Sequence, residues 1–146
     1  MDTSAIETGY RFSRSQICND NEARAFALAS GDDNPLHHDA AYAATTRFGR
    51  PIVSGTYTVA LLMGLAASHF ARMGEVVGVR FQFELLQPVF PDERIDLAWE
   101  VSAIRPHRNG RLLDLDGSVK DEAGRPCVRA TGSVLVPRAA KRASQA

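Results

Sequence analysis

The chain has 146 residues, 45% of them apolar, and its 17 Lys and Arg residues balance its 17 Asp and Glu residues. This length fits one domain with a hydrophobic core, which we expect over residues 1–137, followed by a polar, disordered tail over 138–146. The neutral charge balance argues against a nucleic-acid partner or a membrane partner. The first ten residues lack the basic and apolar regions of a secretory signal, which predicts a cytoplasmic location.

Helices are predicted in the first half of the chain. Asn19, with a glutamate three residues later, has the pattern of a capping box before a helix over residues 20–30. Asp39 is placed to cap a short helix over residues 40–46. Residues 54–72 are apolar nearly all round in their middle third, which indicates a helix enclosed by other elements. Polar interruptions make the same segment an unconvincing membrane span.

Strands are predicted in the second half of the chain. Apolar residues alternate with other residues in four segments, at 77–85, 95–103, 113–119 and 128–136, so each predicted strand has one apolar face. Turn-forming residues separate these segments at a spacing that suits antiparallel connections. With an opening strand near residues 10–17, the pattern predicts an α+β fold in which a curved antiparallel sheet surrounds the long helix.

The candidate site lies in the segment SGDDNPLHHD, residues 30–39. Asn34 and Pro35 favour a turn, so we expect an ordered loop that holds Asp32 and His37 on either side of one rigid bend. An acid and a base held in this way can share one water molecule. The alternative interpretation is that Asp32 or Asp33 ends the preceding helix and His37 is an ordinary surface residue.

Several stretches of the chain also have the pattern of a known family. The segment DDNPLH at residues 32–37 fits the motif of an Asp, any residue, Asn-Pro, any residue and His. Together with AAYAATTRFGRPIVSG and VRFQFELLQPVFPDERI, it resembles the MaoC-like dehydratase and R-specific enoyl-CoA hydratase family, over roughly residues 12–137. The resemblance implies the hot-dog fold, a curved antiparallel sheet wrapped around a long central helix.

The resemblance also implies roles for individual residues. Asp32 and His37 match the catalytic pair, and Gly55 matches the glycine whose backbone N–H faces the thioester oxygen. Hydration of a 2-enoyl thioester requires a group that activates water, a proton donor for C2 and a donor to the developing oxyanion. Ser54 stands where the family commonly has histidine, and we expect it to cap the central helix. The residues expected to contact substrate are Asn34, Ser54 and Tyr57.

Other interpretations of the polar residues are weaker. Adjacent histidines in one loop seldom converge on one ion, so no metal is expected in the segment that holds His37 and His38. Asp33 and His38 occupy variable positions of the motif, and we expect both to be exposed to solvent. A basic turn that includes Arg105 and Arg111 could meet phosphates of CoA, but a solvated hairpin end is the simpler interpretation.

The prediction for function is reversible hydration and dehydration of a 2-enoyl thioester, enoyl-CoA to (3R)-hydroxyacyl-CoA, with no cofactor other than the CoA of the substrate. The sequence does not distinguish CoA from acyl-carrier protein as the carrier. Family resemblance further implies a homodimer whose sheets join edge to edge. Two alternatives are a hot-dog acyl-CoA thioesterase, which would direct water to C1, and a non-catalytic acyl-CoA-binding or partner subunit in which the Ser54 site no longer turns over.

Overall fold

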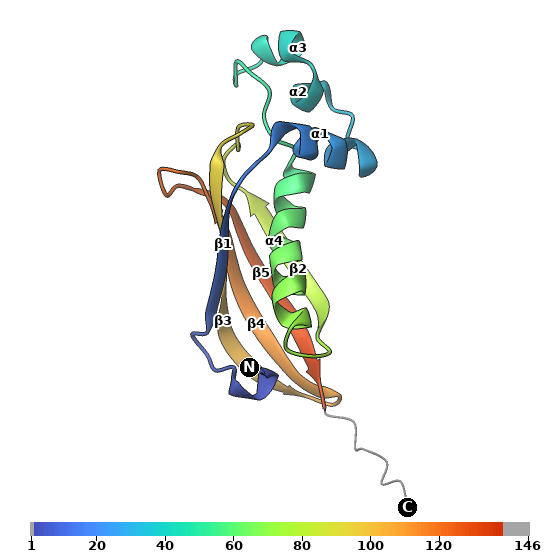
Figure 1. The fold of residues 1–146 in the computed structure, drawn as a ribbon, viewed down its shortest axis with the longest axis vertical. Coiled ribbons are helices and arrows are strands. Elements are labelled where there is room, and N and C mark those ends of the chain that lie inside the picture. The colour runs from blue at the N-terminus through green and yellow to red at the C-terminus, as the bar shows by residue number, and fades with distance from the viewer. Residues whose placement is uncertain (1, 139–146) are drawn as a thin grey trace, which may run out of the picture.

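The computed structural model describes residues 2–138, in which one sheet curves around a long α-helix and the three shorter α-helices gather at one end (Figure 1). The elements in chain order are η1 (Thr3–Ala5), β1 (Arg11–Ile17), α1 (Asp20–Ala29), α2 (Pro35–His38), α3 (Ala40–Ala44), α4 (Gly55–Ala71), β2 (Val77–Leu85), β3 (Arg94–His107), β4 (Gly110–Lys120) and β5 (Pro126–Pro137). The predicted tail falls almost wholly on residues 139–146, which lie outside the described residues.

Within residues 2–138, the strands form one antiparallel sheet in the order β1-β3-β4-β5-β2. Its concave face receives α4, which runs along the strands (Figure 1). On β3 the buried residues alternate with more exposed ones, as the period of two predicts. The predicted α+β fold, a curved antiparallel sheet around a long helix, is therefore confirmed.

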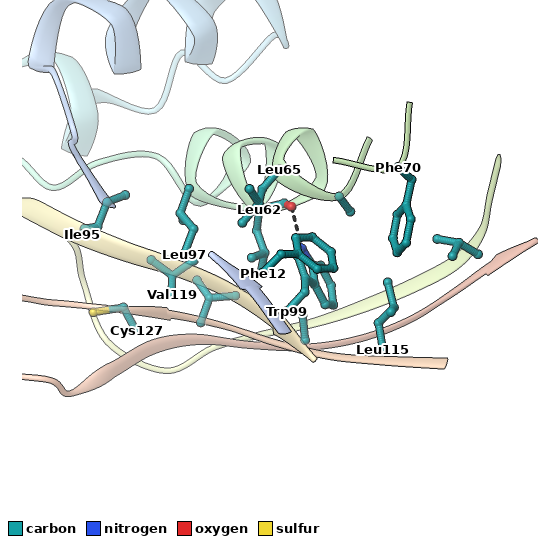
Figure 2. Close-up of a cluster of buried hydrophobic side chains, with 14 of the residues drawn as sticks. Phe12, Leu62, Leu65, Phe70, Ile95, Leu97, Trp99, Leu115, Val119 and Cys127 are labelled. Carbon is teal, nitrogen blue, oxygen red and sulfur yellow. Dashed lines mark hydrogen bonds between the residues drawn. The ribbon is translucent and has the colours of Figure 1, made fainter. Parts of the chain in front are cut away.

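The hydrophobic core lies between α4 and the inner face of the sheet (Figure 2). Leu62 on α4 and Trp99 on β3 are both buried in it. The indole N–H of Trp99 donates a hydrogen bond of 2.8 Å to the backbone carbonyl of Leu62, so a directed contact adds to the packing of helix on sheet. Gly117 on β4 leaves room for this ring, because a Cβ there would lie 2.5 Å from two of the ring carbons.

The two edge strands of the sheet differ in character. β1 exposes mainly polar residues, whereas β2 has exposed fractions of 57% at Val77, 59% at Val79 and 62% at Leu85. The alternation over residues 77–85 predicted one apolar face in the core, and for these three side chains that prediction is wrong. β2 ends the sheet and, among the described strands, its backbone pairs with β5 alone. An exposed apolar edge of this kind is a typical surface for association with another chain.

Side-chain caps begin the short helices as predicted. Asn19 accepts a hydrogen bond of 3.0 Å from the backbone N–H of Glu22 at the start of α1. Asp39 accepts one of 3.0 Å from the N–H of Tyr42 at the start of α3. In the described part of the chain, no helix is both long and apolar enough to cross a membrane.

The segment over residues 30–39 is not only a loop, as the sequence predicted, because it contains the one-turn helix α2. Pro35 is the first residue of this turn, where its fixed φ suits a helix and an N–H is not needed. Asn34 caps the turn, with its side-chain oxygen 3.0 Å from the backbone nitrogen of Leu36. The Asn-Pro pair therefore starts a helical turn, and that turn carries His37.

Candidate active site

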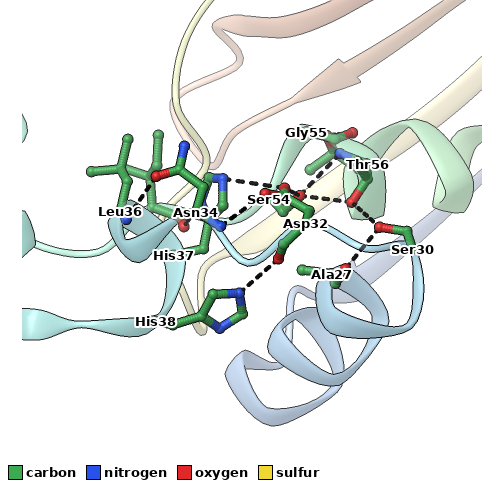
Figure 3. Close-up of polar contacts among 12 residues, drawn as sticks. Ala27, Ser30, Asp32, Asn34, Leu36, His37, His38, Ser54, Gly55 and Thr56 are labelled. Carbon is green, nitrogen blue, oxygen red and sulfur yellow. Dashed lines mark hydrogen bonds and ion pairs between the residues drawn. The ribbon is translucent and has the colours of Figure 1, made fainter.

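Asp32 reaches the site from the C-terminal end of α1 (Figure 3). Gly31 has a left-handed φ of 84°, and the N–H of Asp32 donates to the carbonyl of Ala27 at 2.8 Å, which is the Schellman arrangement at a helix end. One carboxylate oxygen of Asp32 accepts from the hydroxyl of Ser54, and the other accepts from the N–H of Asn34 at 3.3 Å. The hydrogen bond from Ser54 is the main cause that lowers the pKa of Asp32 below its usual 3.8, because it stabilises the charged form.

His37 presents its ring to Asp32 from α2. Its Nδ1 lies 2.8 Å from the backbone carbonyl oxygen of Ile52, and since a carbonyl only accepts, Nδ1 carries the proton. In the neutral ring Nε2 is then free to accept a proton, and it lies 3.4 Å from Oδ2 of Asp32. The side chains are 10% and 23% exposed, so the pair is partly enclosed but still reached by solvent. Such a pair can bind one water molecule and exchange protons with it.

The N-terminus of α4 faces the same region. Ser54 is 1% exposed and caps the helix, with its Oγ 3.2 Å from the backbone nitrogen of Thr56, so its predicted capping role is confirmed. Within residues 2–138 the backbone N–H of Gly55 has no hydrogen-bond partner. A free N–H at the positive end of a helix dipole is a suitable donor to an anionic oxygen.

A cavity of about 310 Å³ brings His37 and Gly55 together. Apolar side chains form much of its remaining wall, among them Phe48, Ile52, Leu85, Leu86 and Val89. Arg47, which is exposed, adds a positive charge to the lining. Asp32 does not line the cavity itself, but its Oδ2 lies 3.4 Å from Nε2 of His37, which does. The cavity can therefore accept an apolar chain with a polar group placed against the helix terminus.

Two other features lie away from this cavity. A larger depression of about 760 Å³ covers the outer face of the sheet and includes none of the predicted site residues. The basic turn between β3 and β4 lies at the opposite end of the sheet from α2 (Figure 1). There Arg105 pairs with Asp114 at 2.5 Å, and Arg111 donates to the backbone carbonyl of Thr3. The turn is thus a hairpin end, remote from the candidate site.

The two other predicted substrate contacts have local roles in this structure. The side chain of Asn34 caps α2, as described above. Tyr57 is buried on α4, and its hydroxyl donates to Glu22 at 3.3 Å while its ring packs on Phe26. Burial raises the pKa of Tyr57 to about 12. Tyr57 does not line the cavity in the described part of the chain, so its contact with substrate stays a prediction.

Asp33 and His38, which are adjacent to the predicted catalytic residues, differ in their exposure to solvent. Asp33 is exposed, as expected. His38 is half-buried, with its Nε2 donating to the backbone carbonyl of Asp32 at 2.9 Å, so the expectation of an exposed side chain is wrong. This contact ties the end of α2 to Asp32, six positions before His38 in the sequence. Within residues 2–138, no three His, Cys, Asp or Glu side chains gather in a way that could hold a metal ion.

Comparison with known proteins places the chain in a family. The family model described as "MaoC like domain" matches residues 2–122. The chain belongs to the MaoC-like domain family. The resemblance recognised in the sequence is therefore confirmed.

Named relatives of this MaoC-like chain act on acyl-CoA compounds. An (R)-specific enoyl-CoA hydratase from Aeromonas caviae is 38% identical over 106 residues, which cover 72% of this chain and 78% of the relative. A 3-hydroxybutyryl-CoA dehydratase from Methylorubrum extorquens is 31% identical over 97 residues, which cover 66% of this chain and 61% of the relative. The solved structure of an (R)-hydratase from A. caviae matches with a TM-score of 0.83 at 29% identity and covers 92% of this chain and 100% of that chain. These matches confirm the hot-dog fold and support a lyase.

Proposed function

We propose that this chain catalyses the reversible hydration of a 2-enoyl-CoA to a (3R)-hydroxyacyl-CoA. The observation that carries the proposal is the distance of 3.4 Å between Oδ2 of Asp32 and Nε2 of His37. His37 lines a cavity that also reaches Gly55 at the N-terminus of α4. The membership in the MaoC-like family and the hydratase and dehydratase relatives support the same reaction class.

In this mechanism the acid–base pair handles one water molecule. Asp32 and His37 accept a proton from the water as its oxygen forms a bond to C3 of the enoyl group. The electron pair of the C2–C3 double bond moves toward the thioester, and the negative charge on its oxygen is stabilised by the N–H of Gly55. The pair then returns a proton to C2, so both groups recover their starting charge. The reaction moves only a water oxygen and protons, and we therefore propose no cofactor.

The wall of the cavity supports an acyl-CoA as the substrate. Its apolar side chains suit an acyl group, and the exposed guanidinium of Arg47 suits the phosphates that CoA carries. CoA is the carrier named for the relatives from A. caviae and M. extorquens. We accordingly propose CoA rather than acyl-carrier protein as the carrier.

We also propose that the partner of this chain is a second copy, joined through β2. The apolar edge with Val77 and Val79 leaves backbone groups on one side of β2 without a strand partner in the described residues. Two such edges can pair with each other, which extends both sheets and covers the exposed apolar side chains.

The experiment that tests the function mixes the purified protein with crotonyl-CoA and follows loss of the conjugated enoyl-thioester absorbance, with a thiol assay alongside. Loss of absorbance without free thiol is the expected result. Release of free thiol would identify the thioesterase alternative, and tight binding without turnover would identify a binding subunit.

Variants of the acid–base pair test the mechanism. We expect Asp32→Asn and His37→Ala each to lower the hydration rate at least about a hundredfold, because each removes a positioned proton-transfer group. Asp33→Asn is the matched control, since Asp33 is adjacent, carries the same charge and is exposed. Near wild-type rates in folded Asp32→Asn and His37→Ala proteins would show that the pair is assigned wrongly.

A further inference from the structure

Two hydroxyl groups at the start of α4 form a hydrogen-bonded chain that leads to the Asp32 carboxylate (Figure 3). Ser54 at the start of α4 contacts Oδ2 of Asp32, and Thr56 Oγ1 lies 2.7 Å from Ser54 Oγ. Ser30 at the end of α1 lies beside this chain, with its Oγ 3.3 Å from Thr56 Oγ1, but its single hydroxyl hydrogen is donated to the carbonyl of Ala27 at 2.8 Å. From the sequence, Ser54 was expected to cap the central helix and to contact substrate, whereas Thr56 and Ser30 had no predicted role.

The chemistry of these groups fixes the direction of the chain. An ionised carboxylate has no hydrogen to donate, so the single hydroxyl hydrogen of Ser54 points to Asp32. Thr56 must then donate its own hydrogen in the 2.7 Å contact with Ser54. Ser54 therefore accepts from Thr56 and donates to Asp32, and hydrogen bonds aligned in this way strengthen one another.

We propose that Ser54, supported by Thr56, is a positioning residue that holds the Asp32 carboxylate beside His37 as a fixed hydrogen-bond acceptor. This inference rests on the proposed function, in which that carboxylate takes a proton from water. Ser54 is 1% exposed, so water cannot replace its hydroxyl without a rearrangement of the helix start. Ser54 donates to the same oxygen of Asp32 that lies 3.4 Å from Nε2 of His37, so its hydrogen bond fixes the edge of the carboxylate that faces the imidazole.

The proposal predicts a particular change in pH dependence. The hydrogen bond from Ser54 is the largest cause of the lowered pKa of Asp32, ahead of the N–H of Asn34 and of the nearby His37 and His38. Loss of the hydroxyl should raise the pKa of Asp32, because its charged form loses a donor. The acidic limb of the pH profile of kcat/KM should therefore move to higher pH.

Two substitutions of Ser54 distinguish the loss of its hydrogen bond to Asp32 from the loss of its cap on α4. Ser54→Gly and Ser54→Ala both lack the hydroxyl, but glycine caps a helix nearly as well as serine, whereas alanine does not. We expect both variants to move the acidic limb to higher pH and to lower kcat roughly tenfold to hundredfold. Ser54→Thr, which restores a hydroxyl, should recover the wild-type profile, and Thr56→Val should shift the limb in the same direction by less.

Asn19→Ala is the matched control, because it removes the cap of α1 without touching Asp32. It should lower stability and leave the pH profile unchanged. A shift in Ser54→Ala alone, or an unchanged profile and kcat in both Ser54 variants, would overturn the proposal.

A second measurement keeps this test separate from the proposed function. Titration of aspartate carboxyl groups by carbon-13 NMR, with the Asp32 signal assigned by its absence in Asp32→Asn, needs no substrate. If the protein hydrates no enoyl-CoA but Ser54→Gly raises the pKa of Asp32, the proposed function fails while the positioning role stands. If the Asp32 titration is the same in wild type and Ser54→Gly, the positioning role fails whether or not the protein is a hydratase.

Discussion

At the scale of single residues, Gly55 is where α4, the end of β2 and the cavity meet. A Cβ built on Gly55 lies 2.7 Å from Cδ1 of Leu85, a side chain that is exposed and free to move. We expect Gly55→Ala to fold, because alanine favours helices, but to lose about tenfold to hundredfold in kcat/KM because its methyl group displaces the thioester from the backbone N–H. Steady-state kinetics with crotonyl-CoA measures the loss.

The double variant Gly55→Ala with Leu85→Ala controls for the contact between these two side chains. If the methyl group acts on the substrate, the loss persists when the Leu85 side chain is shortened. Recovery of wild-type kcat/KM in the double variant would show instead that the clash with Leu85 is the whole effect.

Residues close together in the sequence were the easiest to place from it. Asp32 and His37 lie on either side of one Asn-Pro step, and the structure brings them together as predicted. The contact between Asp32 and Ser54 could not be predicted in this way, because 22 positions separate the residues and the contact depends on how α1 packs near α4. Tyr57 shows the same limit, since its direction is set by Glu22 on α1.

At the scale of elements, the contact between α4 and the sheet depends on the space above Gly117. In Gly117→Ala the new methyl group would meet the ring of Trp99 and strain its hydrogen bond to Leu62. Overpacking of this kind costs about 1–3 kcal/mol, so we expect the free energy of unfolding to fall by that amount. Urea unfolding followed by circular dichroism measures it.

Ser118→Ala is the control on the same strand. Ser118 lies on the outer face of the sheet, where a smaller side chain should change the free energy of unfolding by less than about 0.5 kcal/mol. Equal losses in Gly117→Ala and Ser118→Ala would show that the space beside Trp99 is not the cause.

Long elements were predictable because their patterns repeat. The strands show a period of two over many residues, and α4 is apolar over several turns. The one-turn helix α2 has four residues, which is too short for any helical period to appear. The exposure of Val79 could not be read from its strand either, because alternation shows that a strand has an apolar face but not whether the strand lies at an edge of the sheet.

At the scale of the whole molecule, the apolar edge of β2 bears on assembly. We expect Val79→Lys to weaken association of two copies, because it places a charge on the surface that would be buried. Sedimentation velocity should show a shift from dimer toward monomer. Ser13→Lys puts the same charge on the opposite edge, β1, and should leave the dimer intact. A wild-type monomer at all concentrations would contradict the proposed pairing.

We expect the free energy of unfolding of the whole molecule to fall at mildly acidic pH, because His69 becomes protonated more readily in the unfolded chain. Its Nε2 lies 2.9 Å from the Tyr10 hydroxyl and its ring stacks on Phe12. Burial, with a smaller effect of Arg72, lowers the pKa of His69 below its usual 6.5. The unfolded chain therefore binds a proton at His69 more readily than the folded chain does. The contribution of neutral His69 to the free energy of unfolding is complete above pH 6.5 and declines as the pH falls below it.

The variant His69→Gln removes this titration and keeps a polar group near Tyr10. Urea unfolding at about pH 7.5 and about pH 5 should show a smaller loss of stability in the variant than in the wild type. The comparison between the two proteins cancels the contributions of the other histidines. An identical pH dependence would show that His69 has no part in it.

The buried indole of Trp99 gives this protein an optical reporter. It is the single tryptophan of the chain, it is 1% exposed, and its N–H is bonded to the carbonyl of Leu62 on the central helix. Its fluorescence should accordingly shift to longer wavelength when α4 leaves the sheet and admits water, whatever happens to the short helices around Asp32. In a rapid-mixing experiment, recovery of the short-wavelength emission would give the time at which the helix docks, and comparison with far-ultraviolet dichroism would show whether the strands form before it.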